Sequence, residues 1–240
     1  MAQAQTALDL LSLSPPGWGG NLLRGAVATV EIAFLGYVVG LLLGLGGALG
    51  KLAGPKPVVW LIEAYTGIIR AVPELILVVS LYYAGTDGLN QLLALMGSGP
   101  VEVSGFVAAI FVLGFVQGAY STEVLRAAIL AIPVGQVEAA RAFGMSPLLR
   151  FRRIILPAML AYALPGLANL WMIITKDSAL VAVVGYQELA LATRQAAGMT
   201  KSYFLFYLVA AGLYLVITLG SNQIFKLAER HVRRGQPRLG

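Results

Sequence analysis

The segment VEAARAFGMSPLLRFRRIILPA, residues 137–158, is polar and helix-forming, yet it stands between long apolar stretches of a 240-residue chain. Its first half consists mostly of good helix formers, and Gly144 stands where a glycine ends a helix in a left-handed turn. Ser146 is then a candidate N-cap, and Pro147 takes the first position of a second helix, which leads up to Pro157. The segment is therefore predicted as two short helices joined at a glycine hinge.

The composition of the whole chain indicates a membrane protein. Hydrophobic residues make up 58% and charged residues 12% of the chain, whereas soluble proteins contain roughly 25% charged residues. The lack of cysteine excludes disulfides and cysteine-based metal centres, and one histidine, His231, leaves little for imidazole chemistry, so no metal site is expected. The formal charge of +6 comes without a basic stripe of interleaved aromatics, which favours a lipid surface over nucleic acid as the partner.

Five stretches approach the roughly 20 mainly apolar residues that a membrane-spanning helix needs. They cover residues 25–50, 58–85, 104–130, 157–176 and 203–225. Lysine and arginine gather in alternate connections, which is typical of the cytoplasmic side, and Lys51 and Lys56 are assigned to the first of these connections. The sequence thus predicts an all-α polytopic protein with five transmembrane helices, the N-terminus outside and the C-terminus in the cytoplasm.

The predicted organisation has three parts. Residues 1–24 are predicted as an amphipathic lead-in helix, residues 25–230 as the transmembrane domain with a cytoplasmic loop at 132–157, and residues 231–240 as a basic cytoplasmic tail. The N-terminal region has no basic residue before Arg24, and serines interrupt its apolar patch. It is therefore not predicted as a cleavable signal peptide.

Glycines mark one face of the first predicted span. Gly36, Gly40 and Gly44 recur every four residues, which lets another backbone approach closely, either within the subunit or at a subunit interface. The phrase GLGGALGK at residues 44–51 partly matches a phosphate-binding loop, but leucines replace its first required glycine and the Ser or Thr after its lysine. The chain is therefore not predicted to bind ATP or to act as an enzyme.

The first helix of the 132–157 loop carries small side chains, one large apolar residue and two charges. These residues are Ala139, Ala140, Ala142, Phe143, Glu138 and Arg141. A nearly bare helical face is typical of a helix that lies in a groove of a partner protein. The alternative is an amphipathic helix on lipid headgroups, held by the nearby arginines. Docking is favoured, because alanines supply little of the apolar area that an interfacial helix needs.

The loop resembles the EAA motif of the membrane-spanning permease subunits of bacterial ABC importers. The positions that match at the same spacing are Glu138, Ala139, Ala140, Gly144, Ile154, Leu156 and Pro157. In that family the loop contains the coupling helix, which sits in a cleft of the cytoplasmic ATP-hydrolysing subunit. The resemblance implies that residues 134–144 form this helix here, with Arg141 and Phe143 among its contacts, and that the chain has the type I ABC importer permease fold.

The resemblance also implies a complete transport complex in the bacterial cytoplasmic (inner) membrane. Its other members would be a cytoplasmic ATPase dimer that binds ATP and Mg²⁺, an extracytoplasmic substrate-binding protein and a second permease subunit. A non-identical second permease is favoured over an identical one, and no cofactor is expected on this chain itself. Substrate would cross the membrane by alternating access as the ATPase dimer closes and opens.

Further segments resemble the polar amino-acid uptake subfamily. They are EAYTGIIRAVPEL at residues 63–75, GAYSTEVLRAAILAIPVGQVEAARAFGMS at 118–146 and KDSALVAVVGYQEL at 176–189. ALPGLANLW at residues 163–171 is most similar to subunits that import histidine, lysine, arginine and ornithine, or the opines octopine and nopaline. An importer of basic amino acids or opines is therefore implied. The alternatives are another polar amino acid such as glutamine or glutamate, an ion-gradient-driven secondary transporter, or a passive membrane anchor.

Ionisable residues inside predicted spans are costly, so they mark functional candidates. Asp177 is placed to attract an α-amino group or a cationic side chain, with Lys176 and Ser178 placed to hold a carboxylate or to orient Asp177. The alternative is a Lys–Asp neutralisation that only stabilises a helix break. Asn169, about two turns earlier, is predicted to line the same path. Many members of the family carry glutamate in place of Leu170, which favours an acidic contact from the partner permease.

Two further charged groups are predicted to be mainly structural. Arg70 and Glu74 are four residues apart and are predicted to pair on one helix face. Glu63 belongs to the same group, and Glu63 and Arg70 are kept as candidates for the substrate path. Glu123 and Arg126 are three residues apart and are predicted to form a salt bridge that steadies the helix leading into the loop.

Overall fold

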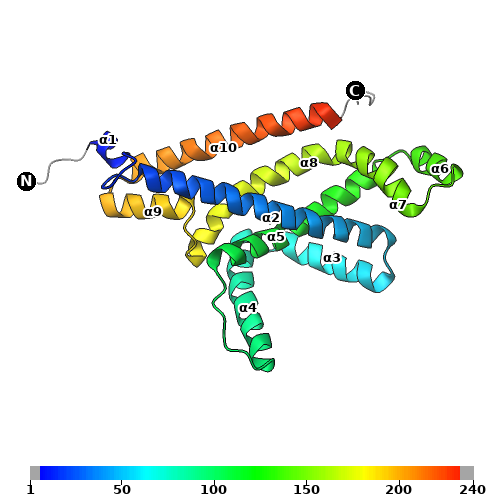
Figure 1. The fold of residues 1–240 in the computed structure, drawn as a ribbon, viewed down its shortest axis with the longest axis horizontal. Coiled ribbons are helices and arrows are strands. Elements are labelled where there is room, and N and C mark those ends of the chain that lie inside the picture. Colours follow the sequence, from blue (N-terminus) through cyan, green and yellow to red (C-terminus); the bar gives the residue numbers. More distant parts are fainter. Residues whose placement is uncertain (1–5, 233–240) are drawn as a thin grey trace, which may run out of the picture.

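The computed structural model describes residues 6–232 and contains, over that range, helices and connecting segments without strands. The elements are α1 (Ala7–Leu10), α2 (Gly19–Ala53), α3 (Lys56–Ala71), α4 (Glu74–Leu95), α5 (Gly105–Leu130), α6 (Val134–Ala142), α7 (Pro147–Arg150), the π-helix η1 (Phe151–Ile155), α8 (Leu156–Asp177), the 3₁₀-helix η2 (Ser178–Val184), α9 (Leu189–Thr200) and α10 (Tyr203–Val232). Figure 1 shows an elongated bundle with α2, α5, α8 and α10 along its long axis, α6 and α7 at one end, and α1 and α9 at the other. The predicted all-α fold is confirmed.

Within residues 6–232, four helical segments are long and apolar enough to cross a membrane. They are Gly19–Ala53, Gly105–Leu130, Pro147–Val184 and Tyr203–Val232. These segments coincide with the first, third, fourth and fifth predicted spans, and three of them extend beyond the predicted limits.

The predicted second span, residues 58–85, is divided into two helices. Val72 is extended, with φ −99° and ψ 138°, because the ring of a following proline disfavours helical geometry in the residue before it. The nitrogen of Pro73 carries no hydrogen, so it also cannot continue the hydrogen bonding of α3. Figure 1 shows α4 leaving the bundle steeply after this break, and α3 and α4 are not among the four segments above. One continuous second span was therefore a wrong expectation.

The two ends of the chain are only partly described. Within residues 6–24, the lead-in contains one short helix, α1, which a capping box formed by Thr6 and Asp9 starts. Helix α2 then begins at Gly19, before the predicted start of the first span. At the other end α10 reaches Val232, and most of the predicted basic tail lies outside the described residues.

The closest helix contact joins α2 to α5 along the predicted glycine face. A Cβ atom added at Gly44 would lie 2.3 Å from Cβ of Ser121 and 2.9 Å from its backbone carbon. One added at Gly40 would lie 2.7 Å from Cβ of Gln117. Real side chains do not approach so closely, so these positions need glycine for the two backbones to meet. Of the two alternatives, the glycine face therefore serves packing within the subunit.

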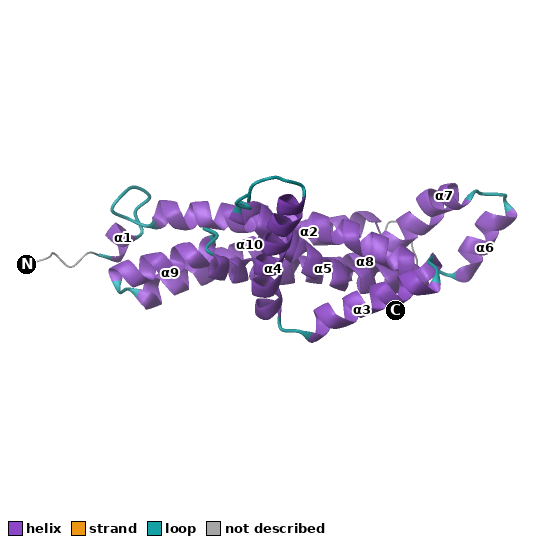
Figure 2. Cartoon of the chain, turned by 90° about the horizontal axis from the view of Figure 1, so that it is seen from below, coloured by secondary structure: helices purple, strands orange, loops and turns teal. Residues whose placement is uncertain are grey.

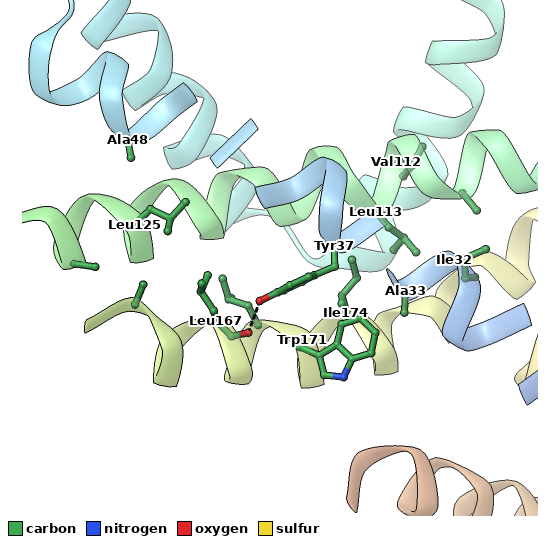
Figure 3. Close-up of a cluster of buried hydrophobic side chains, with 14 of the residues drawn as sticks. Ile32, Ala33, Tyr37, Ala48, Val112, Leu113, Leu125, Leu167, Trp171 and Ile174 are labelled. Carbon is green, nitrogen blue, oxygen red and sulfur yellow. Dashed lines mark hydrogen bonds between the residues drawn. The ribbon is translucent and has the colours of Figure 1, made fainter. Parts of the chain in front are cut away.

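The main core lies where α2, α5 and α8 meet, as Figure 3 shows. Tyr37 donates a hydrogen bond of 2.9 Å from its hydroxyl to the carbonyl oxygen of Leu167. Its ring meets that of Trp171 edge to face, with the centroids 5.5 Å apart. Burial of these aromatic rings with Ile32 and Ile174 fixes the relative positions of α2 and α8.

Candidate functional site

Helix α6 ends in the left-handed turn that the sequence predicts. Gly144 has φ +70°, a conformation that glycine adopts without steric cost. Its N–H donates to the carbonyl oxygen of Arg141 at 2.9 Å, and the N–H of Met145 donates to that of Ala140 at 3.1 Å. These two bonds form a Schellman motif, which satisfies the last carbonyl groups of the helix. The glycine hinge between α6 and α7 is therefore part of the structure.

The chain returns to the bundle as one uninterrupted helical segment. Ser146 caps α7 by accepting a hydrogen bond of 3.4 Å from the N–H of Leu149. Pro157 does not end the returning helix, contrary to the prediction, and lies at the second position of α8. The preceding turn η1 is π-helical, with the N–H of Leu156 bonded to the carbonyl oxygen of Phe151 five residues back. This wider turn accommodates the proline and joins the loop directly to α8.

The outer surface of the α6–α7 hairpin is exposed. In α6 Ala140 is the buried residue, and the side chain of Phe143 is 84% exposed. The other predicted contact residues of this helix, Glu138, Ala139, Arg141 and Gly144, are exposed as well. Of the returning residues, Ile154 and Leu156 are half-buried and Pro157 is exposed. Figure 2 shows the hairpin beyond the end of the bundle, where a partner protein has free access to it.

A second group of charged side chains gathers where α4 begins and α8 ends. Glu74, the first residue of α4, accepts a hydrogen bond of 3.0 Å from the hydroxyl of Tyr120 in α5. The half-buried Asp177 ends α8 and lies within the electrostatic influence of Glu74 and Lys176. Tyr120 in turn lies within that of Asp177 and Arg70. The region around the break between α3 and α4 therefore contains two carboxylates, a hydroxyl and an arginine, of which Glu74 and Tyr120 are in direct contact.

The remaining predicted path residues are arranged differently. Ser178 is buried, and its hydroxyl donates to the carbonyl oxygen of Thr175 at 2.8 Å. Lys176, Asn169 and Glu63 are exposed, and no interaction among residues 6–232 joins Asn169 or Glu63 to Asp177. Leu170, next to Asn169, belongs to the apolar core.

The sequence predicted Arg70 and Asp177 as candidates for the substrate path, but its prediction that Glu74 pairs with Arg70 was wrong. No ion pair joins Arg70 to Glu74 in the described part of the chain, because the extended Val72 ends the helix face that they would share. The feature of the sequence that could have indicated the role of Glu74 was its position directly after Pro73. Tyr120 carried no signal in the sequence, since its partner lies 46 residues away.

Glu188 is a buried carboxylate that sequence reasoning did not single out. It is 0% exposed and caps α9 by accepting a hydrogen bond of 2.8 Å from the N–H of Leu191. The hydroxyls of Thr29 in α2 and Tyr214 in α10 also donate to it, each at 3.2 Å. A Cβ atom at Gly25 would lie 2.9 Å from Cα of Leu189, so α2 touches this cap closely. Glu188 therefore joins three helices at the α9 end.

Burial raises the pKa of the Glu188 carboxyl above its ordinary value. The N–H groups of Ala190 and Leu191 and the hydroxyls of Thr29 and Tyr214 oppose this rise without cancelling it. The stabilising contribution of this raised pKa is complete while both states are protonated, below the ordinary glutamate pKa of about 4.3. As the pH rises from there through the folded-state pKa, the unfolded chain releases its proton first and the contribution is lost.

We expect Glu188→Gln to weaken the pH dependence of stability, since glutamine does not ionise. The purified complex should lose less thermal stability between about pH 5 and about pH 8 when it carries this variant than when it carries the wild-type chain. Thermal unfolding at both pH values measures the difference. Glu102→Gln, which changes an exposed carboxyl, is the control and should keep the wild-type dependence. The same pH dependence in all three proteins would contradict the assignment.

Metal binding has no visible basis in the described residues. Within residues 6–232, no group of three or more histidine, aspartate or glutamate side chains is placed to hold a metal ion.

Long apolar helices with an exposed hairpin at one end are typical of a membrane protein. The comparison with known families agrees with this class, because residues 36–234 match the family described as binding-protein-dependent transport system inner membrane component. The chain belongs to this family, which confirms the permease family and the inner-membrane location inferred from the sequence.

Individual relatives and a solved structure extend the match. The chain is 41% identical over 231 residues to the octopine transport system permease protein OccQ of Rhizobium radiobacter, covering 96% of this chain and 98% of that protein. It is 40% identical over 222 residues to the histidine/lysine/arginine/ornithine transport system permease protein HisQ of Escherichia coli (strain K12), covering 92% and 97%. The structure of an amino acid ABC transporter with histidines aligns with a TM-score of 0.74 and 30% identity, covering 89% and 95%. The predicted type I permease fold is thus confirmed.

Proposed function

We propose that this chain is the permease subunit of an ATP-driven importer of basic amino acids or opines. The observation that carries the choice of substrate is that two carboxylates, Glu74 and Asp177, lie near enough to influence each other electrostatically beside the break between α3 and α4. Two carboxylates favour a cationic group over a neutral one at the same place. The relatives named for octopine and for histidine, lysine, arginine and ornithine support the same class of substrate.

The substrate proposal is tested by binding to the complete complex without its binding protein. We expect Asp177→Asn and Glu74→Gln each to weaken arginine binding by about tenfold to a hundredfold, because a hydrogen bond to a charged group contributes about 1.5–3 kcal/mol. Asp87→Asn, an exposed acid further along α4, is the matched control and should bind like the wild type. Calorimetric titration with arginine and with glutamine measures these affinities. Equal affinity for both ligands, or no change in either variant, would exclude the site.

In the proposed mechanism the α6–α7 hairpin docks in the ATPase. Closure of the ATPase dimer then moves the hairpin and, with it, the spanning helices. Two structural features support this role: α5 leads directly through residues 131–133 into α6, and α7 continues through η1 into α8. Movement of the hairpin therefore reaches both Tyr120 in α5 and Asp177 in α8. Undiminished uptake by cells that lack the ATPase would favour a secondary transporter instead.

The proposed complex contains two ATPase copies, a substrate-binding protein and a second permease that is not identical to this chain. The matched family is dependent on binding proteins, which supports the first two partners. A second permease is supported by an apolar cleft of about 450 Å³ between α4, α5 and α2, lined in part by Leu81, Phe111 and Phe115. Leu170 in place of an acidic residue supports a non-identical partner, since the partner would then supply that contact.

We further infer five membrane crossings, with α3 and α4 together making the second, the N-terminus outside and the C-terminus in the cytoplasm. The arginines of the α6 end and of the last turn of α10 support this orientation, since cytoplasmic segments carry excess lysine and arginine.

The proposal places ATP and Mg²⁺ in the partner ATPase and no cofactor on this chain. The segment at residues 44–51 lies inside the regular helix α2, so its backbone N–H groups are engaged in helical hydrogen bonds and do not form a phosphate-binding loop. The relatives are themselves permease subunits, which supports the same division of labour.

A further inference from the structure

Helix α3 has a weak apolar attachment to the rest of the bundle. The structure describes all of α3, and its buried residues are Thr66 and Ile69. Tyr65 adds a neutral contact, because its hydroxyl donates to the carbonyl oxygen of Phe115 in α5 at 2.5 Å. Ile69 and Tyr65 also pack against α5, with the ring centroids of Tyr65 and Phe115 4.8 Å apart. The polar contacts therefore add to a small apolar interface in determining how firmly α3 follows its neighbours.

One ammonium group links α3 to two other helices. Lys51 Nζ, near the end of α2, donates to Oε1 of Glu123 in α5 at 2.5 Å and to Oγ1 of Thr66 in α3 at 2.9 Å. The side chains of Lys51 and Glu123 are 10% and 21% exposed. Sequence analysis had placed Lys51 in a cytoplasmic connection, whereas it lies within α2 and turns inward.

The second partner of Glu123 differs from the first in what it connects. Arg126 pairs with Glu123 at 3.1 Å, as the spacing in the sequence predicts, but both residues belong to α5. Loss of the Arg126–Glu123 pair changes the charge balance around Glu123 without separating any helices. Only the contacts through Lys51 hold α2, α3 and α5 together by charge in the described part of the chain.

The linked helices lie between the α6 hairpin and the acidic pair. Helix α5 continues into α6, and α3 ends at the break after which Glu74 begins α4. A displacement of α6 therefore reaches α5 first. From α5 it reaches Glu74 by two routes, directly through the hydrogen bond from Tyr120 and through α3 to the extent that α3 moves with α5.

We infer that Lys51, together with Glu123 and Thr66, is a positioning group for coupling that makes α3 move with α5. This inference rests on the proposed function, because it assumes that α6 moves when the ATPase closes. The clamp formed by Lys51, Glu123 and Thr66 makes α3 move together with α5. Closure of the ATPase therefore repositions Glu74 relative to Asp177. Without the clamp, the ATPase still cycles and less substrate crosses per ATP.

The test uses the complete reconstituted complex and measures ATP hydrolysis and substrate uptake together. Thr66→Val removes the arm to α3 at nearly constant volume and leaves the Lys51–Glu123 pair, while Thr66→Ser keeps the hydroxyl. We expect hydrolysis stimulated by loaded binding protein to stay within about twofold of wild type in both, since neither change touches α6. Uptake per ATP should fall about threefold to tenfold in Thr66→Val and recover in Thr66→Ser.

Two further variants separate the clamp from general support of α5. Lys51→Met should lower uptake per ATP at least as much as Thr66→Val, and Arg126→Gln should leave it near the wild-type value. Unchanged uptake per ATP in Thr66→Val overturns the inference even if Lys51→Met fails to assemble. Equal losses in Thr66→Val and Thr66→Ser, or in Lys51→Met and Arg126→Gln, overturn it as well. The proposed function fails separately, if Glu138→Arg in α6 leaves the stimulation of hydrolysis intact.

Discussion

A complex whose α6 helix carries Glu138→Arg is expected to lose the stimulation of ATP hydrolysis by loaded binding protein. Glu138 is exposed on a helix with few large side chains, so its charge is among the few specific contacts that this helix offers. A like-charge contact at a protein interface costs several kcal/mol, so stimulation should fall at least about tenfold. Hydrolysis by the reconstituted complex, with and without the loaded binding protein, measures it.

Gly144→Val should have a similar effect by a different route. Gly144 needs φ +70° to end α6, and this conformation costs a side chain with a Cβ atom about 1–2 kcal/mol, with a branched residue at the upper end. The variant should therefore displace α6 from its groove without changing any charge. Glu102→Arg, the same reversal at an exposed residue before α5, is the control for Glu138→Arg. If both α6 variants assemble and keep full stimulation, the docking surface is not the α6 hairpin.

Gly44→Val is expected to prevent stable folding of the subunit. A Cβ atom there would lie 2.3 Å from Cβ and 2.9 Å from the backbone carbon of Ser121, so the added side chain meets the backbone of α5. Overpacking commonly costs about 1–3 kcal/mol, and a clash with a helix backbone should cost at least the upper value because no rotamer change relieves it. The yield of monodisperse complex after detergent extraction and its thermal unfolding midpoint measure the effect.

The matched control for Gly44→Val lies two residues further along the same helix. Gly46 has no atom within 4 Å of an added Cβ, so Gly46→Val makes the same chemical change without the clash. It should leave stability unchanged or raise it by less than about 1 kcal/mol, because valine is a better helix former than the glycine that it replaces. Equal yields of the two variants would mean that α2 and α5 do not approach as closely as described.

The sequence predicted the long helices well because their signal is local. Long apolar runs and flanking polar residues located α2, α5, α8 and α10, although Pro165 and Asn169 interrupt the run of α8, and the glycine at 144 located the end of α6. The division of the second span was harder to predict. A proline in an apolar run announces a disturbance, but the direction in which α4 leaves depends on its contacts with α5 and η2, which the local pattern does not contain.

The candidate site was predicted only where one residue carried the signal. Asp177 stood out as an acid at the end of an apolar run, whereas Lys51 looked like an ordinary positive charge at the end of a span. Its role depends on Glu123, 72 residues later, and that of Glu188 depends on Thr29, 159 residues earlier. Partners at such separations leave no periodic pattern, so only the folded arrangement identifies them.

The π-helical turn before Pro157 has a mechanical consequence. Because it keeps the helix continuous, residues 147–177 form one helical segment, about 45 Å along its length at about 1.5 Å per residue, with Pro165 inside it. The exposed hairpin is joined to one end of this segment, and Asp177 lies at the other. In the proposed mechanism, a tilt of the hairpin is therefore transmitted along this segment to Asp177, whereas Glu74 belongs to a different helix, beyond the break at Val72 and Pro73. The separation of the two carboxylates is thus expected to change when the hairpin tilts.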